Sequence, residues 1–399
     1  MDEQNSPNYQ SITPPIGFQK LRQVPFYKDK TVDLIVVAVL LFVLAGIFAA
    51  YTYLKAPGNL DKLSPIASRF SDSSAIVVKD VMNPINGVMY TKEESASWIE
   101  NRPLGVMINN HVDARPQSGL IYADLVYEVV AEGGITRFLP FYLSTLPEKV
   151  GPIRSTREYY LIIVREMGDA MLMHEGYSPQ ALEAIQSWPV RSLQRGGGSS
   201  FNWRDNPRNV ATEHTLYSNP QELYKYGVDT LGWGGNRELT SWKFKDEKKV
   251  EAQADVCFVG DCKPIVVDFW YPGDFSGIWN YDVTQNQYAR STGYDETDQP
   301  IPHLDQETKE QIKVKTLIVQ FATESSIVGD DKNRLEYELI GSGEGMVFMD
   351  GGVTNVTWTK ASRDERTMFY DQNGNEFEFN RGKIWISIVP ERNKALVVF

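Results

Sequence analysis

Two strand-like apolar runs, each ending in polar side chains, stand out in the hydrophobic pattern between residues 102 and 179. The first covers residues 102–110 and the second residues 170–176. Between them, residues 126–142 form two β-branched, alternating runs around Gly133-Gly134, which predicts a hairpin because paired glycines supply the positive φ of a tight turn. Ligands of α/β sheets tend to bind beyond strand ends, so we expect the functional site there.

Helices are predicted between and after these strands. Ser155 is followed three positions later by Glu158, a capping-box pattern that predicts a helix running to Met167. Ser178 and Pro179 predict a second helix start, with serine as the cap and proline in the first turn. Strands that alternate with helices indicate an α/β domain, which we place at residues 83–249.

The pattern changes after about residue 250. Short apolar and β-branched runs follow one another up to residue 389, separated by Gly, Asp and Asn turns such as Asp350-Gly351 and Asn373-Gly374. This pattern is typical of a mostly antiparallel β domain, which we place at residues 250–399.

The longest apolar run, residues 34–54, contains no charged side chain. About 20 such residues are enough to cross a bilayer, so the run predicts a transmembrane helix. A cleaved signal peptide fits less well, because the run is long and no clear cleavage site follows it. Lysine and arginine are more frequent before the run than after it, which favours an amino terminus inside the cell. We therefore expect a disordered cytoplasmic tail at residues 1–33, a spacer at residues 55–82, and a single-pass cell-membrane protein with its globular part outside the cytoplasm.

Composition narrows the range of partners. The formal net charge is −12 and the pI is near 5.0, which argues against non-specific binding to nucleic acid or to an anionic membrane surface. The chain has two cysteines, Cys257 and Cys262, whose spacing allows either a small disulfide or two reduced thiols beside a turn. No cofactor motif is found.

The chain resembles the YerB-like lipoprotein family through motifs at residues 102–111, 114–120, 127–138 and 148–157, with further matches from Tyr288 to Trp385. The resemblance covers about residues 83–399 and implies an extracytoplasmic protein with two domains of unknown function. One departure is clear. The lipoproteins of this family are anchored by a lipidated cysteine, whereas no cysteine lies near the apolar run of this chain.

Polar side chains at strand ends, helix starts and the family motifs are the candidates for ligand binding. They are Asn109, Asn110, His111, Arg115, Arg137, Arg154, Ser155, Arg157, His174, Glu175 and His214. The alternative is that they are ordinary polar ends of buried strands. A zinc site from His111, His174, His214 and a carboxylate is an alternative, but no spacing motif supports it, and we predict no metal.

Two functions follow from these candidates. The first is binding of a cell-envelope component or an envelope protein through the α/β cleft, with no assigned catalytic activity. The alternative is a cell-envelope hydrolase or transferase that uses His111, His174 or Glu175 as acid or base. Glu128 and Glu132 could act as paired acids in glycoside hydrolysis, although alternation on a solvated face is the commoner meaning.

Arg154 and Arg157 flank Ser155 at a predicted helix start. Guanidinium groups and free backbone N–H groups together favour an anion, so this segment predicts a carboxylate or phosphate site. The competing interpretation is that one or both arginines pair with Glu128, Glu132 or Glu158.

Overall fold

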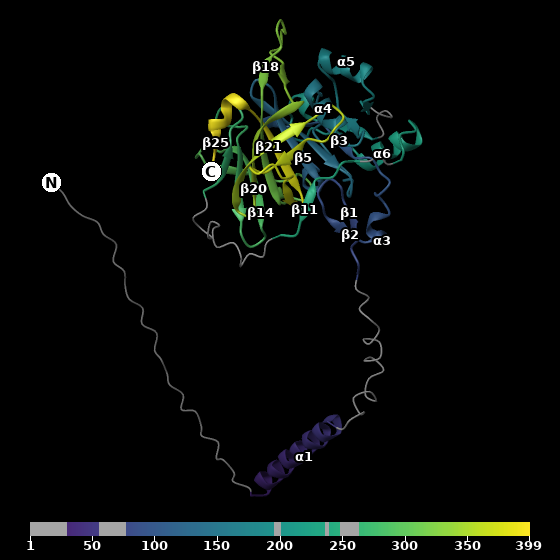
Figure 1. Cartoon of the computed structure of the whole chain (residues 1–399). Helices are drawn as coiled ribbons and strands as arrows, with labels where there is room; N and C mark the ends of the chain where they lie inside the picture. The colour runs from purple at the N-terminus through teal and green to yellow at the C-terminus, as the bar shows by residue number, and fades with distance from the viewer. Residues whose placement is uncertain (1–29, 56–76, 195–200, 236–238, 248–262) are drawn as a thin grey trace, which may run out of the picture. The chain divides into compact units, whose positions relative to one another are not determined.

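A computed structural model describes residues 30–55, 77–194, 201–235, 239–247 and 263–399. The chain divides into two units, Met1–Val77 and Val78–Phe399 (Figure 1). The first contributes helix α1 (Lys30–Lys55), and the second contains all the other elements.

Helix α1 covers the long apolar run. The side chains described within it, at residues 37–49, 51 and 52, are exposed, including Phe42 at 84%. Across the described residues, no helix has both the length and the apolar character needed to cross a membrane. The structure therefore does not support the transmembrane helix predicted at residues 34–54, although a helix does form over this run.

An eleven-stranded mixed sheet forms the centre of the second unit. Six strands come from the amino-terminal half: β3 (Leu104–Val106), β4 (Ile108–Asn109), β5 (Leu125–Glu132), β6 (Ile135–Tyr142), β7 (Met171–Met173) and β8 (Arg191–Ser192). Five come from the carboxy-terminal half: β17 (Thr316–Ala322), β20 (Gly341–Met349), β21 (Gly352–Lys360), β22 (Met368–Tyr370) and β24 (Ile384–Pro390).

The strand order is β22-β21-β20-β17-β24-β5-β6-β3-β7-β8, with β4 beside β6. Strand β24 pairs in parallel with β17 on one side and with β5 on the other. The two halves of the unit, on either side of residue 250, are thus joined by a continuous hydrogen-bonded ladder. The central strands β5, β17 and β24 are buried almost throughout, as expected for strands covered on both faces.

A second, six-stranded sheet comes entirely from the carboxy-terminal half. Its strands are β12 (Ile265–Val267), β13 (Gly277–Asp282), β14 (Gln287–Tyr294), β15 (Pro300–Pro302), β16 (Lys313–Val314) and β25 (Val397–Val398). All its pairings are antiparallel, in line with the antiparallel character predicted for this half.

Four strand pairs lie outside the two sheets. They are β1 (Val81–Met82) with β2 (Met89–Tyr90), β9 (Asn202–Arg204) with β10 (Leu216–Ser218), β11 (Lys243–Lys245) with β23 (Glu378–Asn380), and β18 (Glu324–Ser326) with β19 (Leu335–Tyr337). Short 3-10 helices complete the connections: η2 (Val112–Ala114), η3 (Leu120–Tyr122), η4 (Thr212–His214) and η6 (Glu391–Leu396).

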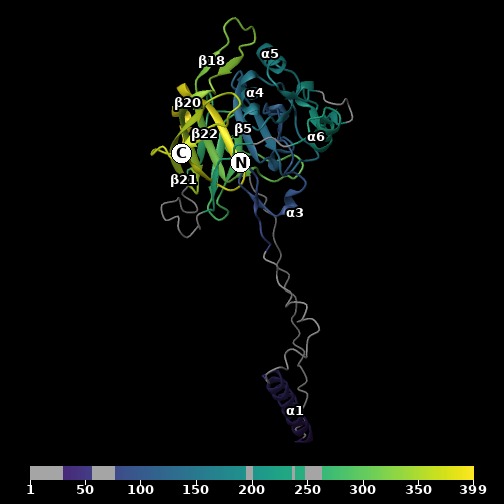
Figure 2. The same cartoon turned by 45° about the vertical axis from the view of Figure 1, so that its right-hand side comes forward.

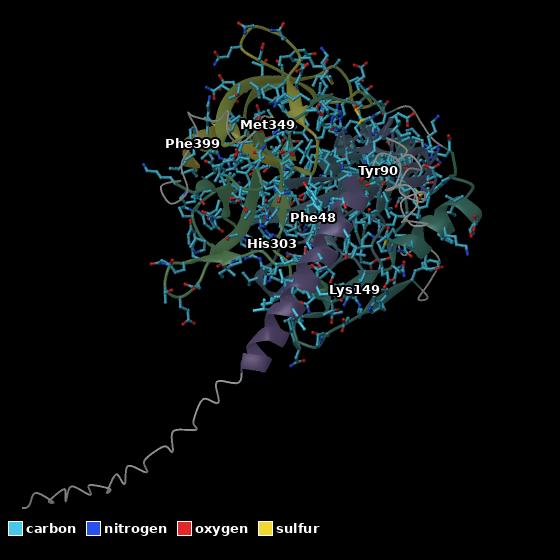
Figure 3. All side chains as sticks on the ribbon, turned by 90° about the horizontal axis from the view of Figure 1, so that it is seen from below. Phe48, Tyr90, Lys149, His303, Met349 and Phe399 are labelled. Carbon is cyan, nitrogen blue, oxygen red and sulfur yellow. The ribbon has the colours of Figure 1, made fainter. Side chains whose placement is uncertain are left out.

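Among the described residues of this unit, the α-helices belong to the amino-terminal half: α3 (Lys92–Ser95), α4 (Glu158–Arg165), α5 (Pro179–Ser187) and α6 (Pro220–Asp229). Figures 1 and 2 show α5 and α6 beside the amino-terminal strands, away from β20 and β21. The C-cap residue of α4, Glu166, pairs with Lys360 at the end of β21. In the view from below, Tyr90 and Lys149 likewise lie on one side and Met349 and Phe399 on the other (Figure 3).

Of the two predicted helix starts, the one at Ser178 is confirmed and the one at Ser155 is not. The Ser178 side chain accepts a hydrogen bond from the N–H of Ala181, with Pro179 in the first turn of α5. The predicted cap at Ser155 is wrong, because α4 begins at Glu158 and its N-cap residue is Arg157. The Ser155 hydroxyl instead donates to the carbonyl of Glu175 at 2.8 Å, which ties the chain before α4 to the end of β7.

A buried ion pair joins the two sheets. Arg290 on β14 donates to both carboxylate oxygens of Glu128 on β5, at 3.1 and 3.0 Å, and neither side chain is more than 1% exposed. The guanidinium lies 4.7 Å from the ring centroid of Trp385, and the rings of Phe138 and Trp279 lie within 6 Å. Trp385 Nε1 also donates to Glu128, at 3.1 Å. The pair is therefore enclosed by aromatic rings from both sheets.

Arg290→Met should lower the free energy of unfolding by about 3 to 5 kcal/mol, because it leaves the Glu128 carboxylate buried without its cation. Adding Glu128→Gln should recover part of the loss, since a neutral pair costs less to bury than a lone charge. Urea unfolding measures both effects.

Lys394→Ala is the control, because it breaks an exposed ion pair with Glu344 and should change stability little. Equal losses for Arg290→Met and Lys394→Ala would contradict the role given to the buried pair.

Candidate functional site

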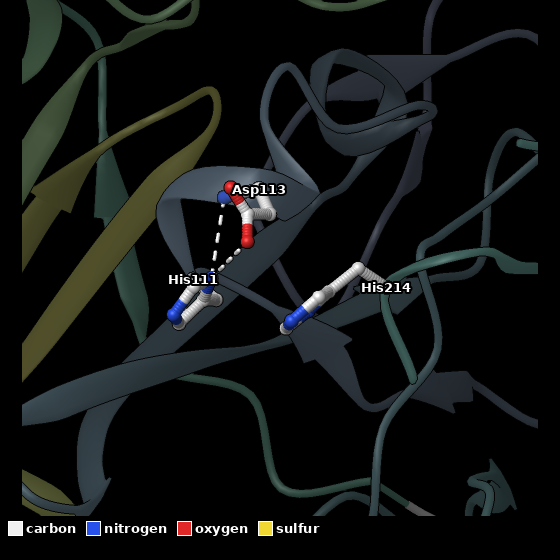
Figure 4. Close-up of side chains that lie close together, drawn as sticks. All are labelled: His111, Asp113 and His214. Atoms are coloured by element: carbon white, nitrogen blue, oxygen red, sulfur yellow. Dashed lines mark hydrogen bonds and ion pairs between the residues drawn. The ribbon is translucent and has the colours of Figure 1, made fainter. Parts of the chain in front are cut away.

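The polar residues after β4 meet the segment before β10. His111 follows the end of β4, and His214 lies in η4. Their rings stack with centroids 4.5 Å apart and planes 16° from parallel, and Asp113 lies beside His111 (Figure 4). Two of the histidines singled out in the sequence are therefore brought together from positions about a hundred residues apart.

Asn109 determines which nitrogen of His214 carries the proton. The backbone N–H of His111 donates to Asn109 Oδ1 at 2.9 Å, so the other end of this amide is the NH₂ group. That group lies 2.7 Å from His214 Nδ1 and must donate to it. The neutral His214 ring therefore carries its hydrogen on Nε2.

His111 is held in a similar way. Its Nδ1 accepts a hydrogen bond from the backbone N–H of Asp113 at 3.2 Å, and it lies 3.6 Å from Asp113 Oδ2. The neutral ring then carries its hydrogen on Nε2, and the protonated ring would form an ion pair with Asp113. In the neutral state, both stacked rings offer an Nε2–H donor.

Arg154 adds a cation near these rings. Its backbone N–H donates to the Met107 carbonyl at 2.9 Å, and its carbonyl accepts from the Glu175 N–H at 3.0 Å, so the chain is fixed between β4 and the end of β7. Burial lowers the pKa of Arg154, while the nearby Glu213 carboxylate acts to raise it. Burial lowers the pKa of His214, with further contributions from His111 and Arg154. Within the described part of the chain, no hydrogen bond or ion pair involves the Arg154 guanidinium.

A metal ion fits this arrangement poorly. His111, Asp113 and His214 each have a ligand-type atom, and these atoms lie within 4.8 Å of one another. However, His214 Nδ1 is occupied by Asn109 and its Nε2 carries a hydrogen, so neither nitrogen has a free lone pair. Lone pairs lie in the plane of an imidazole, and two nearly parallel planes cannot both point at one ion. The site thus favours a ligand that accepts hydrogen bonds.

His174 lies apart from this cluster. Its Nδ1 donates to the Gly176 carbonyl at 2.9 Å, which leaves Nε2 to accept from the Ser192 hydroxyl at 2.8 Å. Burial lowers the pKa of this histidine to about 4. Both nitrogens of His174 are therefore bonded within the protein, close to the end of β7. His174 does not join His111 and His214 as the zinc alternative requires.

The arginines predicted to form one anion site are separated by their partners. Glu132 accepts hydrogen bonds from Arg157 and from Arg137, the latter at 2.8 Å. Burial acts to raise the pKa of Glu132, but the two guanidinium groups hold it below its usual value. Arg137 also donates to the Ser155 carbonyl at 2.6 Å. Arg157 and Ser155 are thus bonded within the protein, in line with the competing interpretation that Arg157 pairs with Glu132, and the anion site at Arg154, Ser155 and Arg157 stays a prediction.

Asn110 and Arg115 connect the two halves of the unit. Arg115 donates to the Asn110 carbonyl at 3.0 Å and to the Asp274 carbonyl at 2.6 Å, and its guanidinium lies 5.4 Å from the centroid of Phe275. Asn110 Nδ2 donates to the Thr136 hydroxyl at 2.7 Å. These two candidates act as connections within the protein.

Asn109 is also connected to the buried ion pair. Arg290 donates to His303 Nδ1 at 2.6 Å, so His303 Nε2 carries a hydrogen and donates to Gln117 Oε1 at 2.8 Å. Gln117 Nε2 then donates to the Asn109 carbonyl at 3.0 Å. A second path runs from Glu128 through the hydroxyl of Thr136 to Asn110. The site is thus held by hydrogen bonds that begin in the core.

Sequence reasoning did not identify Asp113, Glu213 or Gln117 as part of this region. The Asn-Asn-His-Val-Asp run at residues 109–113 was the available signal for Asp113. Nothing in the local pattern links Gln117 to His303. The predicted cysteine pair, Cys257 and Cys262, lies outside the described residues.

Family models match both halves of the chain. The DUF3048 amino-terminal domain, described as a protein of unknown function, matches residues 87–233, and the DUF3048 carboxy-terminal domain matches residues 266–386. The chain belongs to the DUF3048 family. The cluster of His111, Arg154 and His214 lies within the amino-terminal match, whereas Arg290 and His303 lie within the carboxy-terminal match.

Similar proteins support the DUF3048 assignment. The chain is 28% identical over 336 residues to a Bacillus subtilis (strain 168) protein named "Putative lipoprotein YerB", covering 83% of this chain and 93% of that protein. It also matches the crystal structure of YerB from Bacillus subtilis, with a TM-score of 0.64, 28% identity, and coverage of 78% of this chain and 97% of that one. The two-domain, strand-rich fold is therefore shared with YerB.

His174→Gln should reduce the pH dependence of stability without affecting the cluster of His111 and His214. Between its folded pKa of about 4 and an unfolded value near 6.5, the unfolded chain binds a proton that the native chain does not. Native stability therefore falls as the pH drops through this window, by about 1.4 kcal/mol per unit. The difference in unfolding free energy between pH 7 and pH 5 should be smaller in the variant by about 2 kcal/mol.

Urea unfolding at the two pH values measures this difference. The buried His303 is present in both proteins, so its contribution cancels. An unchanged pH dependence would show that His174 can be protonated in the native state.

Proposed function

We propose that this DUF3048 protein is an extracytoplasmic binding protein that holds a carboxylate of a cell-envelope ligand between His111, Arg154 and His214. One observation carries the proposal. A guanidinium with no partner among the described residues lies near two stacked imidazoles whose Nδ1 atoms are both used as acceptors. Three donor groups then remain for a ligand that accepts hydrogen bonds.

The charges around the cluster favour a singly charged ligand group. Asp113 and Glu213 carry negative charge close to the two rings, and the Coulomb contributions of both reach His214. A dianionic phosphate would be repelled more strongly than a carboxylate. Arg154 supplies the one positive charge that a carboxylate needs.

The alternative of a hydrolase or transferase loses one of its three predicted residues. Both nitrogens of His174 are bonded within the protein, and its pKa is lowered to about 4 by burial. An acid or base working near neutral pH needs a pKa close to the working pH, so His174 is poorly suited to that task. Binding is the function that the described residues favour.

Attachment to a membrane forms the second part of the proposal. The Bacillus subtilis relative is named "Putative lipoprotein YerB", and a lipoprotein carries a membrane-binding group. The described side chains of α1 are apolar at almost every position and exposed, including Phe42, Ile47 and Phe48. A soluble protein rarely exposes such a surface, so we infer that α1 associates with the membrane in place of a lipid anchor.

Arg154→Ala should weaken ligand binding by about 10- to 150-fold, which corresponds to 1.5 to 3 kcal/mol for a charge-assisted hydrogen bond. The melting temperature should change little, because the Arg154 guanidinium has no described partner to lose. The measurement is calorimetric titration of the purified protein with soluble cell-wall fragments, prepared once with free and once with amidated carboxylates.

Two arginine controls separate this result from a loss of folding. Arg157→Ala should lower the melting temperature, because Arg157 pairs with Glu132. Arg208→Ala removes an exposed charge and should change neither the ligand affinity nor the melting temperature. Equal affinity for free and amidated fragments, or equal affinity of the Arg154 variant and the unaltered protein, would refute the carboxylate site.

Deleting residues 30–55 should move the protein from the membrane fraction to the soluble fraction of lysed cells, because the deletion removes the exposed apolar surface of α1. Replacing the same residues with an equally long Gly-Ser segment tests whether length alone matters. Recovery of either variant in the membrane fraction would contradict attachment through α1.

A further inference from the structure

A cavity of about 820 Å³ lies where the two halves of the folded unit meet, on a different set of residues from the carboxylate site. Its walls come from the segments around β2 and η3 in the amino-terminal half, and from β14, β16 and the start of β24 in the carboxy-terminal half. This volume falls within the range of about 300 to 1,000 Å³ typical of ligand pockets.

A buried carboxylate, that of Asp124, lines this cavity and is hydrogen-bonded within the protein. Asp124 is fully buried and accepts hydrogen bonds from the amides of Asn83 and Asn86, from the Ser144 hydroxyl, and from the backbone N–H groups of Leu143 and Ser144. Its carboxylate is therefore already satisfied. A ligand would meet a preformed wall and would need no positive charge of its own.

The lysines of the cavity are also occupied. Lys313 donates to Gln285 Oε1 at 3.0 Å, and Lys315 pairs with Glu247 at 2.7 Å. Lys383 donates to the Ile121 carbonyl, and the nearby carboxylates of Asp124 and Glu310 offset its charge. A strongly anionic ligand would have to displace these partners, so the cavity favours a neutral ligand.

Uncharged polar groups remain for such a ligand. Among the described residues, no hydrogen bond is found for the side chains of Gln287, Tyr122 or Thr145, and the amide NH₂ of Gln285 likewise has no described partner. Amides, phenols and hydroxyls can each donate and accept, which matches the hydroxyl groups of a sugar. The rings of Tyr90 and Tyr122 add flat surfaces on which a sugar ring can pack.

We propose that this cavity binds a neutral carbohydrate chain. Val88 and Ile121 are its only aliphatic lining side chains among the described residues, and they lie with the rings of Tyr90 and Tyr122 among polar groups, a mixed lining that suits both the apolar faces and the hydroxyl groups of a sugar. The proposal goes beyond the carboxylate site and stands on separate residues. A protein with both sites could hold a glycan through the cavity and a carboxylate through Arg154.

The test is calorimetric titration of the full-length, detergent-solubilised protein with neutral tetrasaccharides of glucose and of N-acetylglucosamine, and with neutral tetrapeptides. At least one tetrasaccharide should bind and the peptides should not. Tyr122→Ala and Gln287→Ala should each weaken this binding by about three- to tenfold, the effect expected for the loss of a hydrogen bond or a packing surface.

Two controls keep the result specific. Tyr271→Ala alters an exposed tyrosine outside the cavity and should leave sugar binding unchanged. Arg154→Ala should also leave it unchanged, so failure of the carboxylate site does not affect this test. Circular dichroism of each variant checks folding. The proposal is overturned if no tetrasaccharide binds, if the peptides bind in their place, or if the cavity variants bind sugar as well as the unaltered protein does.

Discussion

The Glu128–Arg290 ion pair is the interaction on which the arrangement of this protein most depends. Burying two charges costs free energy unless each is fully hydrogen-bonded. Here the Glu128 carboxylate on β5 also accepts from the indole on β24, and the Arg290 guanidinium on β14 also donates to the imidazole after β15. Because these strands belong to two sheets and to both family domains, the pair fixes how the sheets pack. A shift of either sheet would leave a charge without its partner.

The candidate site is connected to the Glu128–Arg290 ion pair by a series of hydrogen bonds. Arg290 can only donate hydrogen bonds, so His303 must accept at Nδ1 and donate at Nε2. Gln117 therefore accepts from His303 through its amide oxygen and donates to the Asn109 carbonyl through its NH₂ group. At the far end, Asn109 holds His214 with its Nε2–H available. The bonds from the core hold the backbone of Asn109, and the His111 N–H orients its amide, so the site presents fixed donors that suit recognition of a ligand acceptor better than binding of a metal ion.

The sequence predicted local features well where one residue type fulfils a backbone requirement. Gly133 and Gly134 have φ of 61° and 79° and join β5 to β6, as the hairpin pattern predicted. Ser178 and Pro179 begin α5 as expected. Ser155 failed as a cap because its hydroxyl bonds to the Glu175 carbonyl, a long-range contact that outweighs the local capping pattern.

Long-range pairing explains the other differences from the sequence analysis. His111 and His174 both follow buried strands, yet only His111 meets His214, because Gly176 and Ser192 occupy both nitrogens of His174. Arg154 and Arg157 are three residues apart, but Glu132 bonds only the second. Which polar group already has a partner depends on the three-dimensional fold, and spacing along the chain does not reveal it.

The protonation of His214 decides whether the site presents hydrogen-bond donors or a nitrogen that can bind a metal ion. Nitrogen-15 NMR of the histidine side chains, recorded near neutral pH, distinguishes a ring with its hydrogen on Nε2 from one with its hydrogen on Nδ1. We expect the Nε2–H form for His214, and a shift of the ring resonances when a carboxylate ligand is added. An Nδ1–H form would contradict this expectation, because Asn109 could then not be the donor and Nε2 would be free to bind a metal ion.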